Sequence, residues 1–320
     1  MLKIFTAAAA VITAIVLMIS YICYRIVFFV PEKNKGRTMP LKGDAYKPHR
    51  ETMKKMQEEA AALPYEDLYI KSFDGLTLHA RYYEKIKGAD TEILFHGYRG
   101  SADRDLSGAV QRCFAIGRNA ILVDQRTSGK SEGNVITFGI KEHRDCLDWV
   151  NFAVKHFGSD VNFIISGISM GASTVLMAAG RELPPNVKGV LADCAFITAE
   201  EIIRKCCGDM KLPAALVYPF IKLGAKLYGH FDLGEYSALE GVKNCTLPVI
   251  FFHSEQDDFV PSYMSCKLYE NCVSPKHLEI IKGAGHGLAY ILDSERYLCA
   301  ISGFFTENGL ETTVTNKINE

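Results

Sequence analysis

Three residues in the second half of the sequence have the side-chain types of a nucleophilic catalytic site, in the order serine, carboxylate, histidine: Ser169, Asp257 and His286. Serine is a weak nucleophile at its ordinary pKa and needs an adjacent imidazole to accept its proton. The imidazole needs a carboxylate that fixes its tautomer and stabilises its charged form. The three residues lie far apart along the chain, so only the fold can bring them together.

Ser169 is the centre of Gly167-x-Ser169-x-Gly171. The apolar, β-branched run at 161–165 predicts a buried strand, and the Ala-, Leu- and Met-rich run at 172–181 predicts a helix. A strand that turns abruptly into a helix needs small residues two before and two after its strained apex. The pattern favours Ser169 as a nucleophile at a helix N-terminus, where free N–H groups stabilise an oxyanion. The alternative is a structural turn serine.

His286 lies in a glycine-rich loop, Lys282–Gly287, that follows the strand predicted at 277–281. A loop histidine is more often solvated than catalytic. Here its position after the serine and the acid, together with its glycine-rich setting, favours a general base.

Strands alternate with helices of 9–18 residues along most of the chain, which predicts a mostly parallel sheet covered on both faces. In such sheets, ligands bind beyond the carboxyl ends of the strands, where His96, Asp124 and Ser169 fall. The predicted strands are 67–73, 76–83, 91–95, 120–123, 161–165, 187–192, 247–252 and 277–281, and the predicted helices are 106–116, 140–157, 172–181, 262–270 and 288–305.

Four motifs follow one another in order along the chain: His96-Gly97-Tyr98-Arg99-Gly100, Asp124-x-Arg126-x-x-Gly129-x-Ser131, Gly167-x-Ser169-x-Gly171, and Asp257-x-x-Val260-Pro261 followed by His286. On these motifs, the sequence from about residue 65 to 305 resembles α/β-hydrolase fold enzymes, and is similar to the serine aminopeptidase-type and monoacylglycerol lipase-like hydrolases. It departs from the usual pattern at Thr127 and Ser254, which stand where glycine is usual; both departures concern loop conformation.

The resemblance implies Ser169 as nucleophile, Asp257 as acid and His286 as base. It also implies an oxyanion hole formed by the backbone N–H groups of Tyr98 and Met170, and it implies no cofactor. Two other carboxylates are candidates for the acid: Asp258, the neighbour of Asp257, and Asp193, which follows the preceding strand. Asp257 is favoured because it lies four residues before Pro261. His96, Asp124, Arg126 and His253 are interpreted as structural.

The N-terminal stretch 4–30 is apolar apart from a few hydroxyl groups, Cys23 and Arg25. Its run from Ile4 to Cys23 is long enough to cross a bilayer, and no small-x-small site indicates a cleaved signal peptide. We therefore expect a single-pass N-terminal membrane anchor. More lysine and arginine residues follow this stretch than precede it, which favours a cytoplasmic catalytic domain.

The domain organisation follows from composition. Residues 31–62 are charged and contain prolines and glycines, which indicates a tether, with a short helix at 51–61. The expected regions are a transmembrane anchor at 1–30, a tether at 31–62, an α/β-hydrolase domain at 63–308 with a lid at about 196–244, and a polar tail at 309–320.

The segment Leu212–Tyr228 within this lid is strongly apolar. Leu216, Val217, Phe220, Leu223 and Leu227 have spacings that favour one helical face, with Lys222 and Lys226 on the other, although Pro219 is expected to kink the helix. Such a lid is suited to rest in a membrane interface and admit apolar substrates. Ordinary core packing is the alternative.

The predicted function is hydrolysis of a carboxylic ester, thioester or amide through an acyl-enzyme. A peptidase, an acyltransferase of the same fold and a non-catalytic membrane-tethered binding protein are the alternatives. The expected partners are a small-molecule acyl substrate, with lipid as one candidate, and a membrane through the N-terminal helix. The formal charge of −1 gives no case for nucleic acid, and no metal-ligand spacing or phosphate-binding loop is present.

Overall fold

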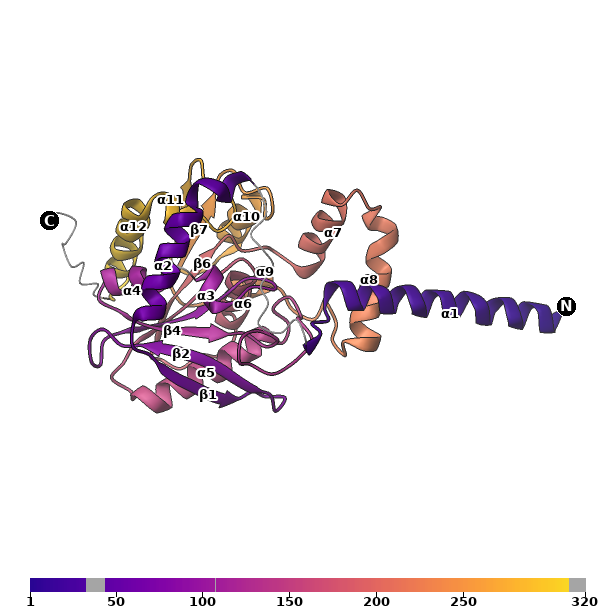
Figure 1. Ribbon diagram of the computed structural model, residues 1–320, viewed down its shortest axis with the longest axis horizontal. Helices are drawn as coiled ribbons and strands as arrows, with labels where there is room; N and C mark the ends of the chain where they lie inside the picture. Colours follow the sequence, from indigo (N-terminus) through magenta and orange to yellow (C-terminus); the bar gives the residue numbers. More distant parts are fainter. Residues whose placement is uncertain (33–43, 107, 311–320) are drawn as a thin grey trace.

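A computed structural model describes residues 1–32, 44–106 and 108–310 of the chain. Its centre is an eight-stranded sheet, and a long N-terminal helix projects away from it (Figure 1). The strands are β1 Glu66–Lys71, β2 Thr77–Tyr83, β3 Thr91–Phe95, β4 Asn119–Asp124, β5 Phe163–Ile168, β6 Val187–Asp193, β7 Val249–Ser254 and β8 Lys276–Ile281.

The sheet has the strand order β1-β2-β4-β3-β5-β6-β7-β8. Strand β2 is antiparallel to both of its neighbours, and β3 to β8 form a parallel sheet. Ile93 on β3 is paired with Ile121 on β4 and with Ile165 on β5. The mostly parallel sheet expected from the alternation of strands and helices is therefore confirmed.

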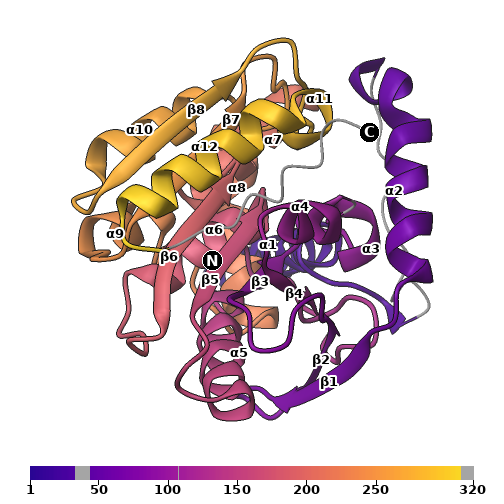
Figure 2. The ribbon, with the colours of Figure 1, turned by 90° about the vertical axis from the view of Figure 1, so that its left-hand side faces the viewer.

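Helices cover both faces of this sheet (Figure 2), and successive apolar residues of one strand serve opposite faces. Ile165 belongs to the core under α5, α6, α9 and α10, whereas Ile164 belongs to the core under α12. The helices of the two layers are α2 Arg50–Ala62, α3 Ala102–Asp105, α4 Ala109–Ala115, α5 Glu142–Phe157, α6 Met170–Ala179, α9 Ala238–Asn244, α10 Tyr263–Asn271, α11 Ala289–Leu292 and α12 Ser294–Glu307.

One helix expected to be continuous is interrupted. The prediction at 288–305 becomes α11 and α12, because Asp293 caps α12 by accepting a hydrogen bond from the backbone N–H of Arg296. The helix predicted at 106–116 is observed as the shorter α4, and the four-residue α3 ends just before the predicted range.

The N-terminal helix α1 spans Leu2–Val27 and projects from the rest of the molecule, with the N-terminus at its tip (Figure 1). Its length and apolar composition are sufficient to cross a membrane, and little of its surface is buried. Helix α1 is therefore a candidate membrane anchor, as the sequence predicted.

The chain joins the domain immediately after this helix. Phe28 is fully buried and its ring packs edge-on against Phe138 and Phe231. Phe29 forms a β-bridge with Val135. The expected separation of anchor and domain by a tether is therefore not what the structure shows, because the aromatic residues after Val27 are core residues.

Residues 44–62, in the second half of the expected tether, also lie on the domain. They form the 3-10 helix η2 at Asp44–His49 and then α2, which confirms the short helix predicted at 51–61. Met53 of α2 is buried in the core beneath α12. The earlier residues 33–43, and the expected tail beyond Leu310, lie outside the described residues.

Three helices follow β6 in the region expected to form a lid: α7 at Ala199–Asp209, α8 at Ala214–Tyr228, and α9. Helix α8 continues through Pro219, so this proline does not end it. Helix α9 belongs to the domain and packs beside α6. Helices α7 and α8 project beyond the domain, and α8 crosses α1 (Figure 1); we call this pair of helices the cap.

Candidate active site

Ser169 stands at the sharp turn between β5 and α6. Its backbone has φ 57° and ψ −118°, a conformation that costs a non-glycine residue energy. The flanking glycines allow the turn, because a Cβ added at Gly167 would lie 2.2 Å from the carbonyl carbon of Gly171. A Cβ at Gly171 would lie 2.0 Å from the carbonyl oxygen of Phe95. The structure thus explains why the sequence has Gly-x-Ser-x-Gly here.

His286 and Asp257 are in direct contact. The Nδ1 atom of His286 lies 2.6 Å from Oδ2 of Asp257, and the carboxylate is buried. Burial by itself raises the pKa of Asp257, but the charge of His286 and hydrogen bonds from His253 and His286 outweigh it. The pKa of Asp257 therefore lies well below its usual range, and the carboxylate stays ionised beside the imidazole.

The competing carboxylates make other contacts. Asp258 is exposed, and its backbone carbonyl oxygen accepts a hydrogen bond from Lys205. Asp193 accepts a hydrogen bond from the Tyr297 hydroxyl at 3.0 Å, and burial raises the pKa of its carboxyl. Of the three acids considered, only Asp257 is bonded to His286 among the described residues.

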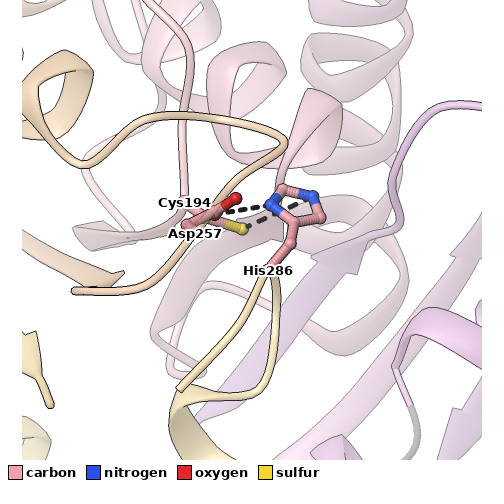
Figure 3. Close-up of side chains that lie close together, drawn as sticks. All are labelled: Cys194, Asp257 and His286. Carbon is pink, nitrogen blue, oxygen red and sulfur yellow. Dashed lines mark hydrogen bonds and ion pairs between the residues drawn. The ribbon is translucent and has the colours of Figure 1, made fainter. Parts of the chain in front are cut away.

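Cys194 is a neighbour of His286 that the sequence analysis did not single out (Figure 3). Its sulfur lies 4.0 Å from Nε2 of His286, and the backbone N–H groups of Ser169 and Gly287 lie close to it. Burial raises the pKa of this thiol, which keeps it neutral. No local pattern marks this residue; only the fold places the turn after β6 beneath the histidine loop.

The backbone of Ser169 and the ring of His286 both lie next to Cys194. Among the described residues, however, the side chains of Ser169 and His286 form no hydrogen bond with each other. Catalytic hydrogen bonds are often long before substrate binds. The side chain of His286 is 17% exposed, and it follows β8 at the carboxyl ends of the parallel strands, as Ser169 follows β5.

Cys194, Asp257 and His286 also have the ligand types of a metal site, and their candidate ligand atoms lie within 4.8 Å of one another. However, the short contact with Asp257 already occupies Nδ1 of His286. The hydrogen-bonded pair alone explains the arrangement, so nothing in it requires an ion. The sequence could not show this group, because its members come from three distant loops.

The two residues expected to supply the oxyanion hole, Tyr98 and Met170, belong to segments that adjoin Ser169. Met170 is the first residue of α6, where backbone N–H groups have no intrahelical acceptor. Tyr98 lies in the loop after β3, and a Cβ added at the preceding Gly97 would lie 3.4 Å from Cβ of Ser169. The loop that carries Tyr98 therefore runs directly past the serine.

His96 braces this loop, as the sequence analysis expected. Its Nε2 accepts a hydrogen bond from the backbone N–H of Gln125, which leaves Nδ1 to donate to the carbonyl oxygen of Gly97 at 2.8 Å. The two bonds fix one tautomer of the ring. His253, also expected to be structural, is fully buried and bonded through its ring nitrogens to Ser265 and Val260.

The end of helix α1 braces the same loop from outside. The Tyr98 hydroxyl donates to the carbonyl oxygen of Val27 at 2.6 Å. The Arg99 guanidinium donates to the carbonyl oxygens of Ile26 at 2.8 Å and Phe29 at 3.2 Å. Burial raises the pKa of Tyr98 to about 12, so its hydroxyl remains a donor at neutral pH. The loop beside Ser169 is thus tied to the last turn of the candidate membrane helix.

A second N-terminal contact supports the histidine loop. The hydroxyl of Tyr46, in η2, donates to the carbonyl oxygen of His286 at 2.7 Å. The contact is close, since a Cβ added at Gly285 would lie 2.8 Å from Cβ of Ala45. Residues expected to form a tether therefore help to hold the histidine loop in place.

The remaining motif, Asp124 to Ser131, is structural. Arg126 is buried and forms ion pairs with Asp145 and Asp74, which is a structural role. Asp124 accepts hydrogen bonds within its own loop and lies 2.8 Å from His79 Nδ1. Thr127 has φ 74°, which explains why glycine is usual at its position.

Comparisons with known proteins agree with this geometry. The sequence profile of the alpha/beta hydrolase fold family matches residues 93–206, which run from β3 through the serine turn to α7. The solved esterase Pf2001 of Pyrococcus furiosus superimposes with a TM-score of 0.64 at 21% identity, over 78% of this chain and 93% of that one. The protein has the α/β-hydrolase fold. The structural likeness at this identity establishes the fold and leaves the activity to be argued from the site.

Two relatives found by sequence similarity match larger parts of this chain than the family profile does. The Bacillus subtilis protein YqkD is 26% identical over 306 residues, which are 95% of this chain and 97% of that protein. The Schizosaccharomyces pombe protein bem46 is 21% identical over 78% of this chain and 79% of that protein. The similarity to YqkD therefore extends over nearly the full length of both chains, including the N-terminal region outside the family profile.

Proposed function

We propose that the protein is a membrane-anchored serine hydrolase that cleaves a carboxylic ester through an acyl-enzyme. Ser169 is the nucleophile, His286 the base and Asp257 the acid of the triad. The observation that carries the proposal is the ionised, buried Asp257 bonded to Nδ1 of His286 at the sheet edge where Ser169 forms a strained turn. This is the arrangement that serine needs to act as a nucleophile.

In the proposed reaction, Ser169 Oγ attacks the carbonyl carbon while Nε2 of His286 takes its proton. The backbone N–H groups of Tyr98 and Met170 stabilise the oxyanion, since they belong to the loop and the helix start that adjoin the serine. The intermediate collapses as His286 gives the proton to the leaving alcohol. Water then repeats the sequence on the acyl-enzyme and releases the acid, so no cofactor is consumed.

Esters are favoured over peptides because we identify no acidic site for a peptide amino terminus. Thioesters, simple amides and an acyl-acceptor alcohol in place of water would use the same acyl-enzyme. A non-catalytic binding role is disfavoured by the strained serine turn, since strain of this kind is retained where it serves a site. The excess of basic residues after α1 favours a cytoplasmic domain.

The test of this proposal is hydrolysis of a series of p-nitrophenyl esters from acetyl to palmitoyl by the purified full chain. Truncation at residue 30 is unsuitable, because it removes the core residue Phe28. We expect turnover, with medium or long acyl chains preferred because the cap is apolar. Failure of the folded protein to hydrolyse any ester of the series would favour the binding role.

The brace between α1 and the loop of Tyr98 gives a second prediction. Arg99→Ala removes two hydrogen bonds from a charged donor, each contributing roughly 1.5–3 kcal/mol. Because these bonds help to position the oxyanion donor of the loop, we expect kcat to fall about tenfold while KM changes little. Arg25→Ala is the matched control, because Arg25 is bonded to Tyr21 and stacks on Phe29 but has no bond to this loop. Equal kinetics for both variants would refute the brace.

A further inference from the structure

Helix α8 of the cap has an apolar stripe on its outer side. We define this outer stripe as Leu216, Phe220, Leu223 and Leu227, which are spaced by four, three and four residues and so share one helical face. Leu216 is 69% exposed and Leu227 is 42% exposed, and the two residues between them are half-buried. Among the described residues, these exposures leave a second apolar side of α8 uncovered by the protein.

The other side of α8 is already packed against the protein. Tyr218, Ile221 and Ala225 belong to the main core, and Gly224 is buried against α1. A surface helix normally has a single apolar face, which meets the core. Since α8 already satisfies that need with its inner residues, its outer stripe must have a different partner.

The position of that partner follows from how α8 is docked on α1. A Cβ added at Gly224 would lie 2.4 Å from the carbonyl oxygen of Ser20, so the two backbones nearly touch. The Tyr228 hydroxyl donates to the carbonyl oxygen of Leu17 at 3.2 Å, and its ring packs edge-on against Tyr21. The cap is therefore fixed at the level of residues 17–24 of the candidate membrane helix.

Residues 17–24 of α1, where α8 is docked, belong to the part of the helix that must lie in the membrane if α1 spans it. The apolar part of α1 begins after Lys3, and residues 4–16 rise only about 20 Å along the helix axis. A bilayer has a hydrocarbon core of about 30 Å, so a span must also include residues at the level of α8. The α1 side chains on the surface away from the cap remain apolar at this level, with Met18, Ile22 and Ile26 exposed.

The charges of α8 agree with a helix at a membrane surface. Lys222 and Lys226 are exposed and lie beside the outer stripe, where they would meet anionic lipid headgroups. Met210 and Leu212, in the turn that leads into α8, are also exposed and extend the apolar surface. An apolar stripe flanked by lysines is typical of helices that lie in the plane of the interface.

We propose that the outer stripe of α8 is buried in the interfacial region of the phospholipid leaflet that α1 enters. The partner is the lipid leaflet itself, and the cap is part of the membrane-binding surface. This inference is independent of the catalytic mechanism, because it rests on the docking of α8 on α1. It also places the cap against a source of acyl lipids.

The experiment uses tryptophan fluorescence of the full chain reconstituted in vesicles of phosphatidylcholine and phosphatidylglycerol, with and without brominated acyl chains. Trp149 is the only tryptophan in the sequence and is fully buried in the core, so it supplies a constant background. Leu216→Trp places a reporter on the outer stripe. Ile86→Trp is the matched control, because Ile86 is 48% exposed and lies before β3, at the sheet edge opposite the site.

We expect the added fluorescence of Leu216→Trp to be blue-shifted and largely quenched by brominated lipid, whereas that of Ile86→Trp is unaffected. Leu227→Trp, on the same stripe, should behave like Leu216→Trp. Emission of both stripe variants that matches the Ile86→Trp control would overturn the proposal. A blue shift without quenching would also overturn it, because it would show that a protein surface covers the stripe.

Discussion

Replacing Ser169 with alanine is expected to abolish ester hydrolysis while leaving the fold intact. The substitution removes only Oγ, and alanine keeps the small Cβ that the tight turn accommodates. Removal of a triad nucleophile costs on the order of 10⁶ in kcat, and the residual rate comes from binding and the oxyanion hole. The measurement is kcat on the preferred ester, with circular dichroism and the thermal midpoint as checks of folding.

The control for this variant is Cys194→Ala. The Cys194 sulfur lies 4.0 Å from Nε2 of His286, so it is the rival nucleophile that geometry offers. Because burial raises its pKa, the thiol is a poor nucleophile, and we expect this variant to retain most of the activity. Substantial turnover by Ser169→Ala, together with loss of turnover in Cys194→Ala, would assign the nucleophile to the thiol.

The second large effect is expected at the acid. In Asp257→Asn, an amide replaces the carboxylate that contacts Nδ1 of His286, so the imidazole loses both its orientation and the charge that stabilises its protonated form. The expected loss is roughly 10⁴ in kcat, with a smaller change in KM. Steady-state kinetics over a range of pH values would measure this loss.

Two asparagine variants of the competing acids complete this test. Asp258→Asn should leave the rate almost unchanged, because the side chain of Asp258 is exposed. Asp193→Asn alters the buried bond to Tyr297, so its effect should appear in stability more than in kcat. The assignment of the acid would be wrong if either variant lowered kcat more than Asp257→Asn does.

Much of the fold and the proposed triad could be predicted because the relevant signals are local. The run before Ser169 is apolar and β-branched, and Gly167 and Gly171 mark a turn in which no Cβ fits. Asp257 and His286 each follow a strand whose pattern is equally clear. Since parallel strands end at one edge of the sheet, predicting the strands was sufficient to bring these three loops together.

The supports of the site could not be predicted, because they depend on contacts between distant segments. Nothing in the sequence around Tyr46 indicates that its hydroxyl reaches the carbonyl oxygen of His286. Charged, proline-containing composition predicted a tether at 31–62, yet composition cannot show that residues 44–62 lie on a surface. Likewise, Phe28 was assigned to the anchor on hydropathy, although a buried core residue is equally apolar.

The face of α8 shows the same limit. The spacing grouped Leu216, Val217, Phe220, Leu223 and Leu227 on one face, but Val217 packs against the core instead. The spacing also could not reveal whether the other four residues face the protein. The structure places smaller and aromatic residues inward, with Gly224 at the crossing with α1. The orientation of this face depends on the close approach of the α8 and α1 backbones at Gly224, which hydrophobic periodicity does not encode.

The central claim is that Ser169 is an activated nucleophile, and covalent labelling tests it most directly. The full chain is treated with a fluorophosphonate probe, digested, and the modified peptide is sequenced by mass spectrometry. The account predicts one labelled residue, Ser169, with labelling lost in Ser169→Ala and strongly slowed in Asp257→Asn. A folded wild-type protein that remains unlabelled, or that is labelled at another residue, would contradict it.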